Sequence, residues 1–256
     1  MVPVLALWLP ESPRFLAGKH DLSPRQAALL QRLGIAPGQA AAHGLDIARG
    51  NPIKMLFSRG YALQTVLLWI IFVCSLMNLF LFVYWLPEVL HLTGFTPAEA
   101  ARATSFRELG AILAVLYLGL AIDRFGPERA LAANYAAGVL FIAAIALVAM
   151  PYILLVAVIF LSGMTIIGSQ TGANAACGKL YPARMRTSGL GWALGIGRLG
   201  GIAEPVLGGY LLSVGLPPRL FFLSACLFAV IAAVATGLLA LRGVRAEPLP
   251  SSSAAD

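Results

Sequence analysis

The sequence predicts an all-α membrane protein with six transmembrane helices. Of its 256 residues, 59% are hydrophobic and only 11% are charged, too few charged residues to keep the surface of a soluble domain hydrated. Six apolar stretches are each long enough to cross about 30 Å of hydrocarbon as a helix of about 20 residues. Membrane-spanning strands would be about half as long and would alternate apolar with polar residues, so the stretches are expected to be helices.

We place the six spans inside a membrane domain of residues 61–242. A charged turn with the sequence DRFGPER separates the second span from the third, and the dipeptide Met150-Pro151 separates the third from the fourth. We expect two three-helix repeats of inverted topology, one on each side of that dipeptide. The spans are expected at residues 62–87, 103–122, 130–149, 151–176, 187–214 and 219–241.

Three further segments lie outside the membrane domain. Residues 1–16 contain an apolar stretch too short to span and without the basic region or cleavage site of a signal peptide. We interpret them as the end of a truncated transmembrane helix. Residues 17–60 are expected to be a cytoplasmic linker, and residues 243–256, with the sequence VRAEPLPSSSAAD after Gly243, a disordered cytoplasmic tail.

The basic residues predict the orientation. Fourteen of the eighteen lysines and arginines lie before the first span, after even-numbered spans or after the last span, and only Arg102 and Arg219 lie in the opposite loops. By the positive-inside rule, both termini are cytoplasmic. Because these residues occupy short loops rather than one face, the net charge of +7 indicates membrane topology and no nucleic-acid partner.

The sequence gives no sign of enzymatic chemistry. The three cysteines, Cys74, Cys177 and Cys226, occur singly in apolar stretches, which indicates neither a disulfide framework nor a metal or redox site. The spans contain no HExxH or GxSxG motif and no paired aspartates. We therefore expect no catalytic residues, no metal and no cofactor.

One glycine motif formally matches a dinucleotide fingerprint. Gly195-x-Gly197-x-x-Gly200 lies inside a predicted span, whereas the fingerprint needs a preceding strand and an exposed helix N-terminus. We therefore interpret the glycines as contacts between closely packed helices, through the pairs Gly191-x-x-x-Gly195 and Gly197-x-x-x-Gly201.

Arg198 is the most informative single residue. It lies about 16 Å along its span at 1.5 Å per residue, where an insertion scale assigns an arginine a cost of about 2.5–3.5 kcal/mol. Its guanidinium could bind a carboxylate with two parallel hydrogen bonds. The alternative is an internal salt bridge that only holds helices together.

Several motifs, in order along the chain, resemble the second half of a major facilitator superfamily transporter. They are PESPRFL at residues 10–16, the six spans, and GLAIDRFGPERAL at residues 119–131. Within that superfamily, WLPEVLHLTGFT at residues 85–96 and the stretch at residues 168–209, which contains YPARMRTSGLGWALGIGRLGG, resemble the aromatic acid:proton symporters, which include transporters of 4-hydroxybenzoate and benzoate. The fold implied is helices 7–12 of the superfamily, preceded by the end of helix 6.

The resemblance implies transport of small organic acid anions with protons across a bacterial inner membrane. It also implies that this chain is a fragment whose missing six-helix half comes from elsewhere or from a second copy. Two other interpretations stay open: a transporter of another metabolite or sugar in the same superfamily, and a six-helix membrane sensor or assembly protein that does not transport.

The site residues expected from the motifs and the polar positions fall into three groups. Substrate contacts are expected from Arg198, Asn78, Gln170, Asn174 and Trp85. Proton coupling is expected from Glu108 and Glu204, unless Glu204 pairs with Arg107. A gate between the two halves is expected from Asp123, Arg124 and Arg129, and Arg186 is either a substrate contact or an anchor at the level of the lipid phosphates. Helix packing alone is the competing interpretation for Gln170 and Asn174, and a charged turn that only follows the positive-inside rule is the competing interpretation for the gate residues.

Overall fold

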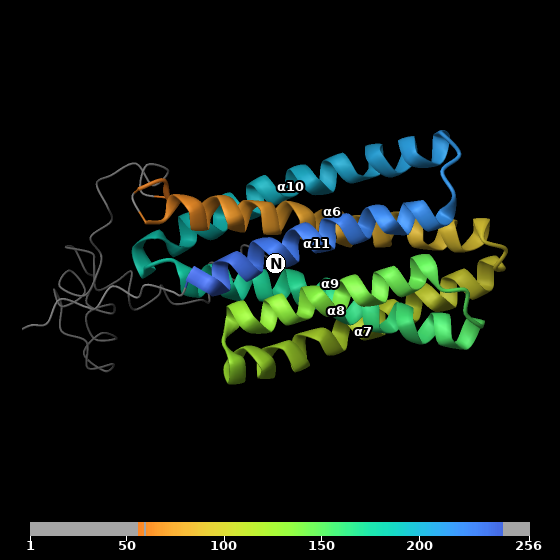
Figure 1. Cartoon of the computed structure of the whole chain (residues 1–256), viewed down its shortest axis with the longest axis horizontal. Helices are drawn as coiled ribbons and strands as arrows, with labels where there is room; N and C mark the ends of the chain where they lie inside the picture. The colour runs from red at the N-terminus through yellow and green to blue at the C-terminus, as the bar shows by residue number, and fades with distance from the viewer. Residues whose placement is uncertain (1–55, 59, 243–256) are drawn as a thin grey trace, which may run out of the picture. The chain divides into compact units, whose positions relative to one another are not determined.

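The computed structural model describes residues 56–58 and 60–242, which form a bundle of six long helices without strands (Figure 1). The segments predicted for residues 1–16 and 243–256, and most of residues 17–60, lie outside the described residues. The helices are α6 (Ala62–Leu92), α7 (Pro97–Phe125), α8 (Pro127–Leu147), α9 (Tyr152–Leu180), α10 (Ala183–Ser213) and α11 (Pro218–Arg242).

The six helices correspond one to one with the six predicted spans. Five of them are long and apolar enough to cross a membrane. The exception is α10, which has 31 residues but is less hydropathic because it contains many glycines together with Arg198 and Glu204. The prediction of an all-α membrane protein is confirmed for the described part of the chain.

The first two helices differ from the predicted spans at their ends. α6 continues through Pro87 to Leu92 instead of ending at the proline, as transmembrane helices can when their neighbours satisfy the freed backbone groups. α7 begins six residues early because Thr96 and Glu99 form a capping box. The Glu99 amide donates to the Thr96 hydroxyl at 3.3 Å, and the Thr96 amide donates to the Glu99 carboxylate at 2.9 Å.

The turn between α7 and α8 has the predicted composition and position. Gly126 ends α7 with a φ of +84°, a backbone conformation that residues with a side chain rarely adopt. Its amide donates to the Ile122 carbonyl at 3.0 Å. Pro127 then occupies the first position of α8, where its missing amide proton costs nothing.

The helix contacts have the symmetry expected of two three-helix repeats. α6 packs mainly on α10 and α11, and α9 packs mainly on α7 and α8, while α6 also meets α9 and α8 meets α11. Exchanging α6, α7 and α8 for α9, α10 and α11 reproduces these contacts. This pattern is what inverted repeats related by a two-fold axis in the membrane plane would give.

Glycines allow the closest helix approach between α6 and α10. A methyl group added at Gly200 would lie 2.5 Å from the Val73 carbonyl oxygen, and one added at Gly201 would lie 2.5 Å from the Phe80 ring. The predicted packing role is therefore confirmed for Gly197-x-x-x-Gly201. Gly191 and Gly195 are exposed, and no described atom lies within 4 Å of such a group, so they make no such contact within the described part of the chain.

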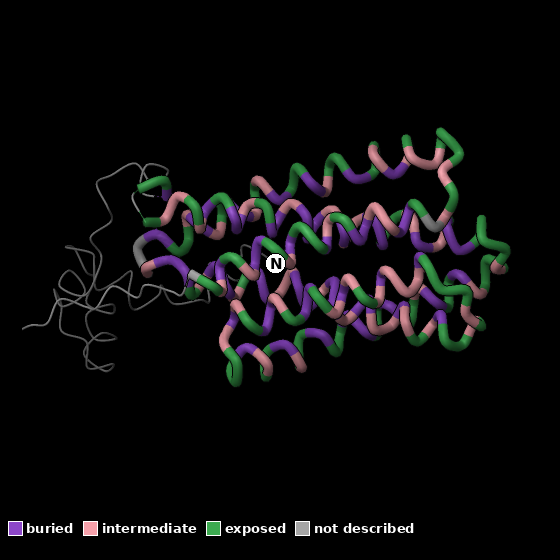
Figure 2. Tube along the Cα trace, viewed as in Figure 1, coloured by how far each residue is buried: buried purple, intermediate pink, exposed green. Residues whose placement is uncertain are grey.

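Buried and exposed stretches alternate along the helices (Figure 2), and the buried side chains include two large apolar clusters with polar residues between them. The cluster nearer the start of α6 includes Phe72, Cys177 and Leu239, and the other includes Phe82, Ile159 and Phe221. On α6, the buried polar residues Ser75 and Asn78 fall between the two clusters. Ser75 and Asn78 thus place polar side chains in the middle of the bundle, at the depth where an internal site would lie.

Candidate functional site

Arg198 lies at the midpoint of α10, and its side chain is exposed. It has no hydrogen-bond or ion-pair partner among the described residues. The buried residues that follow on α10, Gly200 and Glu204, face α6, so Arg198 points away from that contact. The internal salt bridge that was the alternative interpretation does not form within this part of the chain.

Two candidate substrate residues lie on the less buried face of α9, a helix that contacts α10. Gln170 is half-buried, and its side-chain carbonyl oxygen is buried without a hydrogen-bond partner among the described residues. Asn174, one helical turn further on, is exposed. No hydrogen bond among the described residues joins either of them to Arg198, so the structure brings these candidates onto neighbouring helices without linking them.

Asn78 lies inside the bundle rather than on an open surface. It is buried on α6, and with Ser75 and Tyr135 it lines a cavity of about 10 Å³, roughly the smallest space that holds one water molecule. The Asn78 carbonyl, the Ser75 hydroxyl and the Tyr135 hydroxyl form no hydrogen bond of normal geometry among the described residues, although the Ser75 and Tyr135 hydroxyls lie close to each other. Phe72 and Phe82, two aromatic residues on the same helix, belong to the two core clusters.

The sequence analysis missed a polar network beside this cavity. Asn134 on α8 donates through its amide to the Thr165 carbonyl at 2.7 Å and to the Ser169 hydroxyl at 2.8 Å. Its own carbonyl accepts a hydrogen bond from the Tyr117 hydroxyl of α7. A single asparagine in the apolar third span was the available signal, but its partners lie 17, 31 and 35 residues away.

Glu204 and Trp85 meet at the contact between α10 and α6. Glu204 is fully buried, and the indole of Trp85 packs over Gly208, one turn along α10. The Trp85 indole N–H lies close to the Glu204 carboxylate, yet neither group has a hydrogen-bond partner of normal geometry among the described residues. Trp85 also contacts Phe221 edge to face, with ring centroids 6.2 Å apart.

Arg107 pairs with its neighbour Glu108 instead of with Glu204. The Arg107 side chain is 1% exposed and the Glu108 side chain 55% exposed. Two nitrogens of the Arg107 guanidinium are buried without a partner among the described residues. The alternative that Arg107 neutralises Glu204 is wrong, because α7 packs on α9 while α10 packs on α6. The carboxylate of Glu108 is thus paired with the Arg107 guanidinium.

The expected gate residues lie at the turn between α7 and α8. Asp123, Arg124 and Arg129 are all exposed, and none of them has an ion pair among the described residues. The Arg124 guanidinium lies over the Phe125 ring, 5.4 Å from its centroid. Arg186, in the first turns of α10, is exposed as well, so the gate and anchor roles stay predictions.

The other predictions about chemistry can be compared with the described residues. All three cysteines are free and buried, which confirms that they act as small hydrophobic residues. The fingerprint-like glycines lie inside the continuous helix α10, which follows α9 and no strand, so rejecting a dinucleotide site was correct. The described residues contain no group of three or more side chains that could hold a metal ion.

Comparison with known proteins agrees with this architecture. The family model of the Major Facilitator Superfamily matches residues 2–203 and 68–255. A gallate transporter from Pseudomonas putida is 34% identical over 256 residues, covering 98% of this chain and 57% of the relative. The 4-hydroxybenzoate transporter PcaK from Pseudomonas putida is 29% identical, covering 83% of this chain and 48% of the relative.

A further relative has a different aromatic acid in its name. The 3-(3-hydroxy-phenyl)propionate transporter of Escherichia coli (strain K12) is 28% identical, covering 84% of this chain and 46% of the relative. The chain spans about half the length of the curated relatives it matches. Its family match extends over nearly all residues, and its described helices are those of a multi-pass membrane protein. The chain therefore belongs to the Major Facilitator Superfamily, and within it is similar to transporters of aromatic acids.

Proposed function

We propose that the chain forms one six-helix half of a membrane transporter for small aromatic carboxylates. The observation that carries the proposal is Arg198, a guanidinium exposed at the midpoint of a membrane helix with no partner among the described residues. A charged side chain at that depth is energetically costly, and such residues commonly belong to functional sites. The names of the similar proteins, which include transporters of gallate and 4-hydroxybenzoate, support an aromatic carboxylate as the ligand.

Arg198 suits this ligand because its planar fork can donate two parallel hydrogen bonds to one carboxylate. Gln170 and Asn174 on the adjacent α9 are candidates for hydrogen bonds to a ring hydroxyl. Asn78 is a weaker candidate, because it is buried among core helices. In this proposal Trp85 positions α10 by packing on Gly208 rather than stacking on the substrate.

The complete site needs a second six-helix unit. Secondary transporters bind their substrate near the membrane midplane, between two structurally related units. This chain spans about half the length of its relatives, and Arg198 and Asn174 are exposed. We propose that the second unit comes from the remainder of a longer polypeptide or from a second copy of this chain.

We propose proton symport with Glu204 as the coupling residue. Both carboxylate oxygens of Glu204 are buried without a hydrogen-bond partner among the described residues. No neighbouring group in this part of the chain therefore holds the carboxylate in one protonation state. Glu108 is less suited because it is exposed and paired with Arg107. The location proposed is the bacterial inner membrane with both termini cytoplasmic, as the basic loops predict.

The test is uptake into liposomes. The chain is reconstituted alone and together with the amino-terminal half of the Pseudomonas putida gallate transporter, and uptake of labelled gallate and 4-hydroxybenzoate is measured under an inward proton gradient. We expect uptake only when both halves are present. Arg198→Lys should abolish uptake at unchanged protein level, because lysine keeps the charge but loses the fork. Lys179→Gln, an exposed charge change at the end of α9, should have no effect.

Each outcome bears on a separate part of the proposal. Full uptake by Arg198→Ala would refute the role of the guanidinium, and uptake of a neutral sugar but of no carboxylate would refute the substrate class. Uptake by the chain alone would show that a second copy supplies the missing half. Glu204→Gln is expected to bind substrate but to lose uptake driven by the proton gradient; an unchanged response to the gradient would remove Glu204 from the coupling step.

A further inference from the structure

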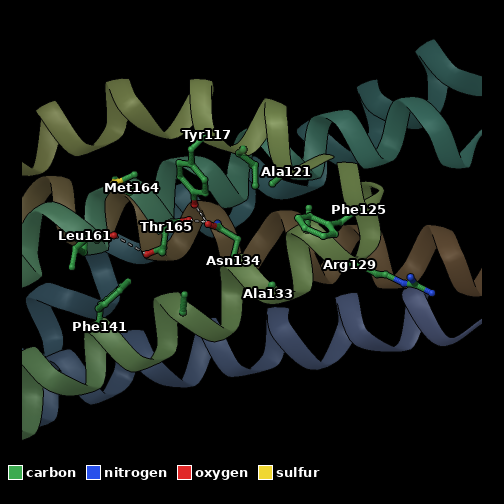
Figure 3. Close-up of a pocket in the computed structure, with 13 residues that line it drawn as sticks. Tyr117, Ala121, Phe125, Arg129, Ala133, Asn134, Phe141, Leu161, Met164 and Thr165 are labelled. Atoms are coloured by element: carbon green, nitrogen blue, oxygen red, sulfur yellow. Dashed lines mark hydrogen bonds between the residues drawn. The ribbon is translucent and has the colours of Figure 1, made fainter. Parts of the chain in front are cut away.

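A groove on the surface of the bundle (Figure 3) is lined by none of the residues proposed to contact the substrate. It has a volume of about 570 Å³ and is lined by α7, α8 and the middle of α9. Ala133 and Ala137 of α8 leave the space open because they are small, and Tyr117, Phe125 and Met164 form its walls. Its size falls in the range of pockets that hold small ligands, about 300–1,000 Å³.

The polar groups at the inner end of the groove are already engaged with one another. The Tyr117 hydroxyl donates to the Asn134 carbonyl, and the Asn134 amide donates to the Thr165 carbonyl and to Ser169. They offer little to a polar ligand, since their donors are used within the protein. The groove therefore presents an apolar wall, which suits a hydrocarbon chain better than an aromatic acid.

A single cation lies at one end of this apolar wall. Arg129, in the first turn of α8, lines the groove, and its side chain reaches toward the end of the bundle (Figure 3). It is exposed and has no ion-pair partner among the described residues. The same turn contains Asp123, Arg124 and Glu128, but none of these three lines the groove. The groove thus combines an apolar length with a positive charge at the level where lipid head groups lie.

We propose that this groove binds one anionic phospholipid, with an acyl chain between α7 and α8 and the phosphate on Arg129. The apolar wall alone would not select a lipid, because all the common lipids have similar chains and the surrounding bilayer is equally apolar. Selection comes from Arg129, since a basic residue near an anionic membrane surface contributes about 1 kcal/mol. A preference of about five-fold for an anionic over a zwitterionic head group corresponds to that energy.

The experiment measures lipid retention by the purified 256-residue chain. The protein is delipidated and then incubated with phosphatidylglycerol or phosphatidylcholine of identical chains, and bound lipid is counted by native mass spectrometry. Glycerol phosphate, which has the head-group phosphate but no chain, separates lipid binding from phosphate binding. We expect about five-fold more phosphatidylglycerol than phosphatidylcholine to be retained, and no glycerol phosphate.

Two variants and one control locate the binding. Arg129→Gln should remove the preference for phosphatidylglycerol, whereas Lys179→Gln, which removes a charge at the same end of the bundle, should keep it. The double change Ala133→Leu with Ala137→Leu fills the groove and should reduce retention of both lipids. Equal preference in Arg129→Gln and Lys179→Gln, or undiminished retention in the filled variant, would overturn the proposal. Unfolding temperatures confirm that each variant is folded.

A photo-crosslinker in place of Phe125 decides what occupies the groove in membranes. Attachment to phospholipid is expected. Attachment to a second copy of the chain or to another protein segment would show that a protein covers the groove, and would overturn the lipid site.

Discussion

Gly200→Ala tests the contact between α6 and α10, which places both Glu204 and Trp85. The added methyl group would lie 2.5 Å from the Val73 carbonyl oxygen and 3.0 Å from the Met77 side chain. Ordinary van der Waals contact begins at 3.4 Å, so the two helices must separate locally by about 1 Å. Inserting one methyl group into a well-packed contact costs about 1–3 kcal/mol.

Gly195→Ala is the matched control on the same helix. A methyl group there has no described atom within 4 Å. Alanine is the better helix former by about 1 kcal/mol, so this variant should be as stable as the original chain or slightly more stable. The two substitutions are chemically identical and lie five residues apart, which isolates the effect of the helix contact.

The three cysteines supply the assay. All are free and buried, on α6, α9 and α11, so a dye that fluoresces on reaction with thiols reports unfolding in detergent during heating. For a protein of this size, 1 kcal/mol shifts the unfolding temperature by about 2–4 °C. Because the gain in helix propensity applies to both variants, we expect Gly200→Ala to unfold about 2–12 °C below Gly195→Ala, which should be unchanged or up to about 4 °C above the original chain. Equal shifts in the two variants would refute the packing of α10 on α6.

Three further predictions concern buried polar groups and orientation. Asn134→Leu should lower the unfolding temperature by about 4–7 °C, measured in the same assay, because it removes three helix-linking hydrogen bonds worth about 0.6 kcal/mol each; no change would show that the network contributes nothing to stability. Glu108→Gln should lower the free energy of unfolding by about 1–3 kcal/mol, because it leaves the buried Arg107 guanidinium without its partner. Combining Glu108→Gln with Arg107→Met should leave the free energy of unfolding nearly unchanged. An equal loss of stability in the single and the double variant would argue against the ion pair. A cysteine at Ala254 should react only with reagents added from the cytoplasmic side, and labelling from outside would refute the predicted orientation.

Hydropathy predicted the helices well because each span must be apolar by itself to cross the bilayer, whichever helices it packs on. The six stretches became six helices. Their boundaries shifted by up to six residues, and the two largest shifts, at the end of α6 and the start of α7, follow from local rules that act against the hydropathy profile. Thr96 and Glu99 extended α7 through a capping box, a signal that was present in the sequence as T-x-x-E. Pro87 did not end α6, since a proline can be accommodated within a transmembrane helix.

The partners of polar side chains could not be predicted in the same way, because they depend on how each helix is rotated in the bundle. Gly191 and Gly197 begin identical Gly-x-x-x-Gly motifs, yet only the second faces α6. Arg107 could have met Glu204 by depth alone, but their helices pack on different neighbours. Asn134 gave a visible signal, whereas Tyr117, which donates to it, was indistinguishable from an ordinary aromatic residue in a span.

The geometry of α10 explains why one helix holds both charged candidates of the proposed mechanism. Gly197, Gly200, Glu204 and Gly208 are buried and spaced three or four residues apart, so they share the face that packs on α6. The glycines bring the backbones close, which excludes water from Glu204, while Arg198 lies outside this face and stays exposed. A movement of α10 against α6 would change the surroundings of Glu204 and the position of Arg198 together. Gly200→Ala therefore perturbs both residues without altering either, and under the proposed function it should weaken proton-driven uptake more than Gly195→Ala does at equal protein level.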